Sequence, residues 1–177
     1  MPRRVVVAGI SGVGKTTLAV RLAAGLGLRH VEVDALFHGP DWQRRPTFVT
    51  DVDAATRGSD WVADSFGYRD VRDLLWDRCD TFVWMDYGRP IVMARVLRRS
   101  FARATYEREL WNGNREGFRD WVDPEHPIRW AWSQHAPRRA QIEAWLAAGH
   151  VADRPTVVRL GSPAAARRWL ARVASVR

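Results

Sequence analysis

The residues whose types and spacing most clearly indicate chemistry lie near the N-terminus. Residues 9–16 read Gly-Ile-Ser-Gly-Val-Gly-Lys-Thr, which fits G-x-x-x-x-G-K-[ST], the pattern of a phosphate-binding P-loop. Lys15 is the one lysine among the 28 Lys and Arg residues of the chain. A compact ammonium on a flexible stem is thus kept at this position, while arginine supplies the positive charge elsewhere.

The P-loop pattern predicts how its residues would serve a nucleotide. The glycines allow backbone N–H groups to turn inward around a phosphate, and the N-terminus of the following helix adds partial positive charge. Lys15 would reach the β- and γ-phosphates, and the Thr16 hydroxyl would bind Mg²⁺. We therefore predict ATP and Mg²⁺ as cofactors. The predicted nucleotide-binding residues of the loop are Gly9, Ser11, Gly12, Val13, Gly14, Lys15, Thr16 and Thr17.

The flanking sequence supplies the strand and the helix that a P-loop needs. Arg4–Ala8 is a short run rich in β-branched residues, which suits a buried strand. After the loop, leucines recur every four residues from Leu18 to Leu26 and form one face of a helix. Gly25 and Gly27 are expected to end that helix.

The whole chain predicts an α/β fold of the P-loop NTPase kind, with a five-stranded parallel sheet covered by helices on both faces. Short apolar strand candidates alternate with helical patterns, which is typical of such sheets. The predicted strands are Arg4–Ala8, His30–Asp34, Asp60–Asp64, Thr81–Asp86 and Thr156–Leu160. Later helices are predicted from Pro90 to about Ala104, from Pro137 to Ala148, and from Pro163 with Ser162 as its N-cap.

The composition limits the class of protein. A length of 177 residues fits one domain, and no run approaches the eighteen or so apolar residues that span a membrane. The first residues run directly into the first strand, so we expect no signal peptide. A single cysteine, Cys79, excludes an internal disulfide and favours the cytoplasm. The net charge of +8 points to anionic partners, either nucleotides or nucleic acid.

Three aspartates are predicted to close strands. Asp34, Asp64 and Asp86 would then lie at the carboxyl edge of the sheet, where ligands bind in such folds. A carboxylate there can hold Mg²⁺ or its waters, or accept a proton from an attacking hydroxyl. We predict Thr16, Asp64 and Asp86 as metal-binding residues and Asp34 as a catalytic residue beside Lys15. The alternative is that each aspartate is only a turn or cap residue after its strand.

An arginine stripe follows the fourth predicted strand. Arg95, Arg99 and Arg103 are four residues apart and so share one helical face. Like charges at this spacing destabilise an isolated helix by about 0.2–0.5 kcal/mol per pair, and a phosphate chain on that face would remove the repulsion. We predict that Arg95 and Arg99 bind the nucleotide and take part in catalysis. A solvated helix face is the alternative, and it is our interpretation of Arg103.

Together these motifs resemble adenylate kinases and other small nucleotide kinases. The P-loop matches theirs, the segment from Trp61 to Gly67 looks like their third strand, and Arg95 and Arg99 look like the two arginines that grip the ATP phosphates. The chain is most similar to an adenylate-kinase-like branch known as FlaR-type or "DNA topology modulation" proteins. That resemblance rests on residues 34–37, Trp61 with Asp64, and residues 109–116, and it covers most of the chain. The branch usually has Asp-Gly-Asn-Tyr where this chain reads Asp-Ser-Phe-Gly-Tyr.

The resemblance also bears on the phosphoryl acceptor and on a lid. In sugar-type and shikimate-type P-loop kinases an aspartate after the second strand contacts the substrate hydroxyl, and Asp34 occupies that place. Phe37 and Trp42 would either sandwich a base or belong to the core. Residues 105–133 are expected to form a helical lid over the phosphates. Its region and the helix after it offer arginines that would reach the transferred phosphate, with Arg115, Arg129, Arg138 and Arg139 as the candidates.

The predicted function is ATP- and Mg²⁺-dependent phosphoryl transfer to a small substrate, either a nucleotide or a nucleoside-like compound. A hydroxyl acceptor is favoured because an alcohol benefits from a general base such as Asp34, whereas a phosphate does not need one. The rival hypothesis is a nucleic-acid-associated P-loop ATPase or regulator, which the charge and the mixture of tryptophan and arginine favour. Any such nucleic-acid binding is expected to be weak. A third alternative is a nucleotide-binding protein without catalytic activity.

Overall fold

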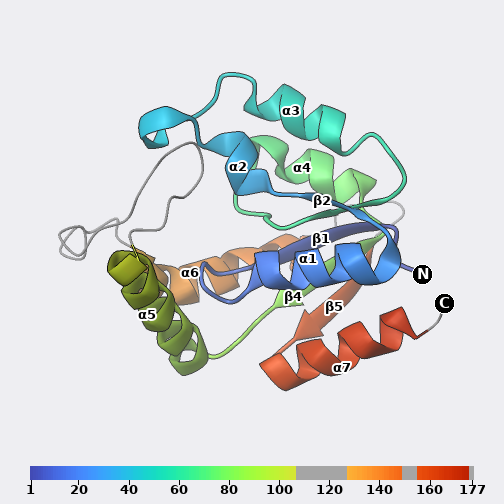
Figure 1. Cartoon of the computed structure of the whole chain (residues 1–177). Coiled ribbons are helices and arrows are strands. Elements are labelled where there is room, and N and C mark those ends of the chain that lie inside the picture. Colours follow the sequence, from blue (N-terminus) through green and yellow to red (C-terminus); the bar gives the residue numbers. More distant parts are fainter. Residues whose placement is uncertain (107–126, 149–154, 176–177) are drawn as a thin grey trace.

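A computed structural model of the chain describes residues 1–106, 127–148 and 155–175, and for residues 103–106 and 127 it describes the backbone alone. Five parallel strands form one sheet in the order β2-β3-β1-β4-β5 (Figure 1). The strands are β1 Arg4–Gly9, β2 Arg29–Val31, β3 Trp61–Ala63, β4 Thr81–Met85 and β5 Thr156–Leu160. The parallel sheet predicted from the sequence is thus confirmed, with β1, the strand before the P-loop, at its centre.

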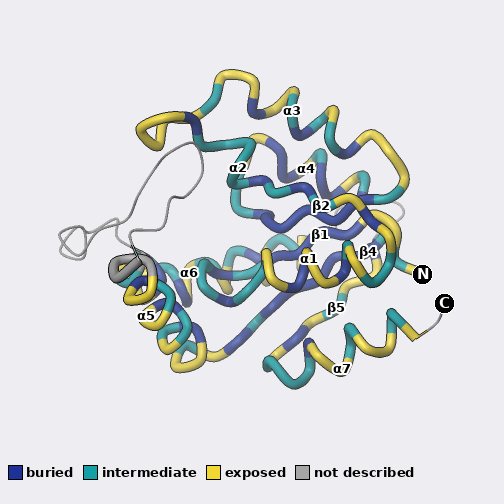
Figure 2. Tube along the Cα trace, in the orientation of Figure 1, coloured by how far each residue is buried: buried dark blue, intermediate teal, exposed yellow. Residues whose placement is uncertain are grey.

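Helices cover both faces of this sheet. They are α1 Lys15–Leu26, α2 Val33–Phe37, the 3-10 helix η1 Pro40–Trp42, α3 Phe48–Ala55, α4 Arg69–Arg78, α5 Arg89–Tyr106, α6 Pro127–Ala147 and α7 Pro163–Ala174. Side chains alternate along β1, so Val5 and Val7 pack with residues of α1, α5 and α7. Val6 and Ala8 pack on the other face with residues of α3, α4 and α6. The three inner strands β1, β3 and β4 are accordingly buried along nearly their whole length (Figure 2), whereas the edge strands β2 and β5 are partly exposed.

The helix after the P-loop begins and ends at glycines. Gly14 is its N-cap and Gly27 its C-cap, and Gly27 adopts a left-handed φ of 69° while its N–H donates to the Ala23 carbonyl. The prediction that Gly27 ends the helix is confirmed. Gly25 instead lies within α1, where its backbone stays helical.

Two sequence predictions of element boundaries were wrong. The second strand stops at Val31, and Asp34 lies in the first turn of α2 and not at a strand end. The cause is a tertiary hydrogen bond, because the carboxylate of Asp64 accepts the Val33 N–H at 3.0 Å and so starts the turn into α2. The helix predicted to open at Pro137 begins ten residues earlier, with Pro137 in its interior.

Part of the predicted lid falls outside the description. Residues 107–126 and the resemblance segment 109–116 lie outside the described residues, and so does the side chain of Arg103. The remaining ends of the range 105–133 belong to α5 and α6. In the part of the chain that the structure describes, no helix has the length and apolar content to cross a membrane. Cys79 is buried, and burial raises the pKa of its thiol to about 12.

The predicted cap of α7 gives a test of the fold. The Ser162 hydroxyl accepts a hydrogen bond from the Ala165 N–H at 3.2 Å. We expect Ser162→Ala to lower the free energy of unfolding by about 1 kcal/mol, measured by chemical denaturation. Ser175→Ala is the matched control, because Ser175 is exposed at the other end of α7 and its hydroxyl only donates to the Arg172 carbonyl. Equal losses in the two variants would contradict the capping role.

Candidate active site

The P-loop has a backbone that only glycine can follow at its tightest points. Gly9 and Gly12 have φ values of 144° and 81°. A Cβ added at Gly9 would lie 2.7 Å from the Met85 carbonyl oxygen, and one at Gly12 would lie 2.1 Å from Cγ2 of Val96. The loop is therefore pressed against β4 and α5. Its N-cap, Gly14, provides no side-chain cap for α1, which leaves first-turn N–H groups to bind an anion.

Four charged side chains from distant parts of the sequence act on Lys15. Its Nζ donates to the Ile10 carbonyl at 3.3 Å. Burial lowers the pKa of the Lys15 ammonium, while the carboxylates of Asp34 and Asp64 act to raise it. The charges of Arg99 on α5 and Arg138 on α6 lower this pKa further. Most of the residues predicted to be catalytic thus lie within electrostatic reach of one ammonium.

Asp64 is a buried carboxylate that faces the start of α1. It directly follows β3, as the sequence predicts. Burial acts to raise the pKa of its carboxyl, but the contact with His30 and the hydrogen bonds from the Thr16 hydroxyl and the Val33 N–H outweigh burial and hold this pKa below its usual value. His30 Nε2 lies 3.4 Å from Asp64 Oδ2, and this contact raises the pKa of the imidazole. The Asp64 carboxylate is therefore ionised and fixed.

Thr16 and Asp64 have the right chemistry for Mg²⁺. Mg²⁺ takes oxygen ligands and usually binds one or two protein groups together with substrate phosphates. A hydroxyl and an ionised carboxylate in contact at a P-loop fit that description. Among the described residues no group of three or more acidic, histidine or cysteine side chains forms a dedicated metal cage. The residues present thus suit a cation that arrives with a nucleotide.

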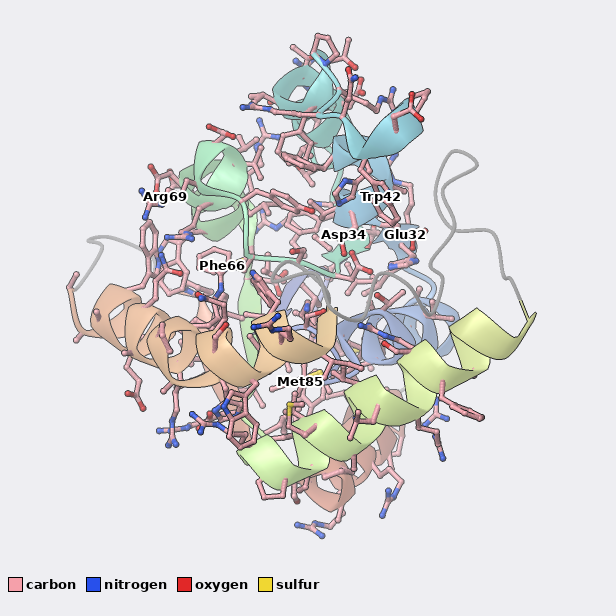
Figure 3. The ribbon with its side chains drawn as sticks, turned by 90° about the vertical axis from the view of Figure 1, so that its left-hand side faces the viewer. Glu32, Asp34, Trp42, Phe66, Arg69 and Met85 are labelled. Carbon is pink, nitrogen blue, oxygen red and sulfur yellow. The ribbon has the colours of Figure 1, made fainter. Side chains whose placement is uncertain are left out.

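Asp34 is held by a tyrosine that the sequence did not single out. The Tyr68 hydroxyl donates to Asp34 Oδ1 at 2.8 Å. Burial and the nearby Asp34 carboxylate raise the pKa of Tyr68, so its hydroxyl stays protonated. The Tyr68 ring also stacks on Phe37, with ring centroids 4.3 Å apart. Asp34 lies below Trp42 in Figure 3, and one of its carboxylate oxygens is oriented by Tyr68.

The two predicted arginines of α5 have different roles in the structure. Arg95 Nη1 donates to the Val13 carbonyl at 2.5 Å, and its guanidinium lies 5.2 Å from the centre of the Tyr87 ring. Arg95 therefore braces the P-loop from α5. Arg99, one turn further along, acts on Lys15 through its charge. Within the loop, Val13 is buried, Ser11 is half-buried, and Thr16 and Thr17 are exposed at the start of α1.

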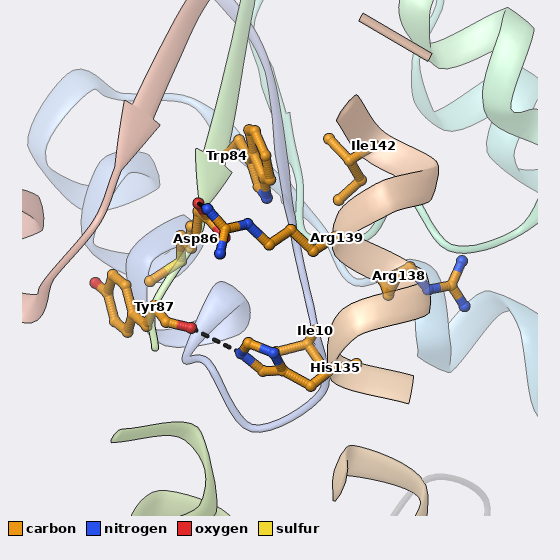
Figure 4. Close-up of a pocket in the computed structure, with 9 residues that line it drawn as sticks. Ile10, Trp84, Asp86, Tyr87, His135, Arg138, Arg139 and Ile142 are labelled. Carbon is orange, nitrogen blue, oxygen red and sulfur yellow. Dashed lines mark hydrogen bonds and ion pairs between the residues drawn. The ribbon is translucent and has the colours of Figure 1, made fainter. Parts of the chain in front are cut away.

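Asp86 lies among arginines. It follows β4 as predicted, but its carboxylate is 3.3 Å from Arg139 and 2.5 Å from Arg159. Beside it a cavity of about 10 Å³, room for about one water, lies between the end of β4 and α6 (Figure 4). His135 lines this cavity and bonds the Tyr87 carbonyl at 2.9 Å. These ion pairs occupy the Asp86 carboxylate in this structure, and its predicted metal-binding role stays a prediction.

Phe37 and Trp42 were predicted either to sandwich a base or to belong to the core, and they differ in the structure. Phe37 packs edge-on against the buried Phe48 at 5.0 Å and so belongs with the core. Trp42 is 43% exposed, and its φ of 59° is unusual for a residue other than glycine. Its ring meets the edge of His38 at 5.3 Å. Phe37 therefore fits the core alternative, and the base-binding alternative stays a prediction for Trp42.

Sequence reasoning did not identify Tyr68, His30 or Arg72. Tyr68 and His30 act through contacts with residues far away in the chain, which spacing does not reveal. Arg72 carried a weak signal, because it lies three residues before the buried Leu75 on the apolar face of α4. A charged residue on a buried helical face is unusual and indicates a special role.

Solved structures of small-molecule kinases are similar to this structure. A gluconokinase from Sinorhizobium meliloti 1021 matches with a TM-score of 0.50 and 19% identity, over 99% of this chain and 95% of that chain. An unliganded sugar kinase from Janibacter sp. HTCC2649 matches with a TM-score of 0.50 and 19% identity, over 99% of this chain and 94% of that chain. A shikimate kinase from Acinetobacter baumannii in complex with shikimate matches with a TM-score of 0.53 and 13% identity, over 98% of this chain and 92% of that chain. No protein-family model matches the sequence, and neither does any curated protein.

These similarities establish the fold. The chain has the α/β P-loop fold of gluconokinases and shikimate kinases, over nearly its full length. The resemblance to the FlaR-type branch is not confirmed by them.

Gly12 provides a test of the P-loop geometry. We expect Gly12→Ala to lower the free energy of unfolding by about 1–3 kcal/mol, because alanine is strained at this φ and its Cβ would collide with Val96. The variant should also lose affinity for a non-hydrolysable ATP analogue, measured by calorimetry. Gly58→Ala is the control, since a Cβ there meets nothing within 4 Å. A Gly12→Ala protein as stable and as tight-binding as Gly58→Ala would show that the loop geometry is wrong.

Proposed function

We propose that this protein is an ATP- and Mg²⁺-dependent kinase that phosphorylates a hydroxyl of a small substrate. The observation that carries the proposal is the meeting of a P-loop lysine with an oriented carboxylate. The Asp34 carboxylate acts to raise the pKa of Lys15, and Asp34 itself accepts a hydrogen bond from the Tyr68 hydroxyl at 2.8 Å. A phosphate-binding loop thus stands beside a group that can receive a proton. The kinase fold of the neighbouring structures supports this interpretation.

The nucleotide side of the site is formed by the P-loop, α1 and α5. Bound ATP with Mg²⁺ would supply the transferable phosphoryl group and neutralise its charge. The loop N–H groups and Lys15 would bind the phosphates, and Thr16 with Asp64 would hold the cation or its waters. Arg95 would keep the loop in shape through the Val13 carbonyl, and Arg99 would add positive charge where negative charge develops.

The acceptor side is formed by Asp34 and Tyr68. Asp34 would orient the acceptor hydroxyl and take its proton. The Tyr68 hydroxyl would keep the carboxylate in place through its hydrogen bond to Oδ1. A phosphate acceptor would be ionised already and would need no such base. The names of the neighbouring structures are those of kinases for small molecules, and one of them holds shikimate. These points favour an alcohol, which includes the hydroxyls of nucleosides and nucleotides.

A nucleic-acid-associated ATPase ranks second. Its support is the net charge of +8 and the mixture of tryptophan and arginine in the second half of the chain. Tryptophans of that half contact arginines of the chain itself, for example Trp132 with Arg89 at 4.9 Å and Trp130 with Arg138 at 5.8 Å from the ring centre. Such stacked pairs serve packing as well as binding, so the contacts of the described residues add nothing specific for nucleic acid.

Lys15 tests the kinase proposal directly. Lys15→Ala should reduce ATP turnover by about 10²–10³-fold, as expected when one group that stabilises the transition state is lost. The fold should remain intact by circular dichroism, because the side chain serves the site and makes only one backbone contact. Arg21→Ala, an exposed residue of α1, removes the same charge away from the site and is the control. Turnover by Lys15→Ala within about threefold of the wild type would overturn the proposal.

Asp34 tests the acceptor class. Once an acceptor is found, Asp34→Asn should lower kcat by about 10²–10⁴-fold for a hydroxyl acceptor, because the amide keeps the shape but takes no proton. Affinity for an ATP analogue should survive, since the loop contacts are untouched. Asp77→Asn, an exposed carboxylate of α4, should have wild-type kinetics. Full activity of Asp34→Asn would rule out the general base and point to a phosphate acceptor.

A further inference from the structure

Two guanidinium groups from different helices approach one backbone carbonyl beside the proposed acceptor site. Arg72 of α4 places Nη2 at 3.4 Å from the Gly67 oxygen, and Arg138 of α6 places Nη1 at 3.5 Å from the same oxygen. Both distances are at the long limit for a hydrogen bond. A single neutral carbonyl therefore receives two cations, and neither is held strongly by it.

Neither guanidinium has a carboxylate partner among the described residues. Arg72 is buried, and its Nε has no hydrogen-bond partner there. Arg138 is half-buried, and its one close bond, at 2.8 Å, goes to the neutral amide of Gln141. Burial lowers the pKa of both arginines. The charges of Arg138 and Arg69 lower the pKa of Arg72 further, while the Asp73 carboxylate acts to raise it. The structure thus keeps like charges together in a poorly solvated place.

Other arginines of the same two helices do form ion pairs with carboxylates. Arg78 of α4 pairs with Asp53 at 2.6 Å. Arg139, the neighbour of Arg138, pairs with Asp86 and Glu143. Buried cations are normally matched by an anion, because an unmatched one is destabilising. Violations of this rule are expected at functional sites, where a ligand can supply the missing charge.

Aromatic stacking explains how the guanidiniums are held, but it does not supply the missing charge. Arg72 lies 5.5 Å from the Phe66 ring centre and 5.3 Å from that of Trp145, and Arg138 lies 5.8 Å from that of Trp130. A guanidinium stacked on a ring face still presents its N–H donors in its own plane. The rings therefore orient two planar donors, which is the geometry that carboxylate and phosphate groups accept best.

The pair adjoins the proposed catalytic groups. Gly67 is followed directly by Tyr68, whose hydroxyl holds Asp34 at 2.8 Å. The charge of Arg138 acts on both Tyr68 and Lys15. In Figure 4 the Arg138 side chain leaves α6 in the direction opposite to Arg139, although both residues line the small cavity. One molecule bound at Asp34 would thus lie near both guanidiniums.

Resting on the kinase function proposed above, we propose that Arg72 and Arg138 bind an anionic group of the phosphoryl acceptor. The acceptor is then a hydroxy compound that also carries a carboxylate or a phosphate. Its hydroxyl faces Asp34 and its anionic group lies between the two guanidiniums. Neutral sugars and nucleosides would lack this second anchor and would bind more weakly.

The test measures binding of simple anions in place of the unidentified acceptor. Acetate is compared with acetamide, and methyl phosphate with trimethyl phosphate, at constant ionic strength and with the P-loop filled by Mg²⁺ and a non-hydrolysable ATP analogue. Filling the loop prevents the phosphate probe from binding there. We expect one anion to bind about tenfold or more tightly than its neutral analogue, as charge-assisted hydrogen bonds predict. The pair that shows the preference identifies a carboxylate or a phosphate as the group.

Variants then locate the binding. Arg138→Met should weaken the preferred anion by about tenfold or more, and Arg138→Lys should restore part of the loss because it keeps the charge without the planar fork. Arg139→Met is the matched control, since it removes the same charge from the next residue, which points the other way. No preference for either anion, or equal losses in Arg138→Met and Arg139→Met, would overturn the proposal.

A second measurement needs no ligand. If Arg138 is retained for binding, Arg138→Met should unfold at the same temperature as the wild type or higher, because a repulsive charge is removed. A lower melting temperature together with unchanged anion binding would show that the cluster only packs the helices, and would also overturn the proposal. The comparison of acetate with acetamide is repeated without nucleotide. If the protein fails to bind ATP, the kinase proposal is overturned, but this repeat still decides whether the anion site exists.

Discussion

The site depends on one buried carboxylate. Asp64 accepts the Val33 N–H at 3.0 Å, which ends β2 and starts the short helix that carries Asp34. The same carboxylate receives the Thr16 hydroxyl at the start of α1 and lies 3.4 Å from His30. A carboxylate taken out of water is stable only when its oxygens are well bonded. The bonds that keep Asp64 ionised are therefore the bonds that join the start of α1 to the turn that carries Asp34.

The charges around Lys15 follow from that arrangement. Acidic groups come from the elements that Asp64 holds together, and basic groups come from α5 and α6 on the other side. Burial makes each of these interactions stronger than it would be in water. In the proposed function, the arginines would lie beside the nucleotide phosphates and Asp34 beside the acceptor hydroxyl. The distribution of charge around Lys15 is consistent with that division.

The sequence predicted the local parts of this structure and missed those made by distant contacts. The P-loop, the strand before it and the Ser162 cap depend on a few adjacent residues, and all were found. Asp34 was placed at a strand end because nothing near it in sequence reveals the hydrogen bond between Asp64 and Val33. Asp86 is at the predicted strand end, but the arginines beside it come from α6 and β5. Pro127 and Pro137 carry the same helix-start signal, and only packing decides between them.

The arginine-rich composition has a physical counterpart in this fold. Guanidiniums stack on aromatic rings at several places, including Arg89 on Trp132 and Arg159 on Trp84. A planar cation can do this while its N–H donors remain free to bond a carboxylate, as Arg159 does with Asp86. Lysine would lose that second contact at such positions. At position 15 the requirement is reversed, because the loop encloses the group and offers it a backbone carbonyl and no ring. The one lysine is therefore where a small, movable charge is needed, and the arginines are where orientation is needed.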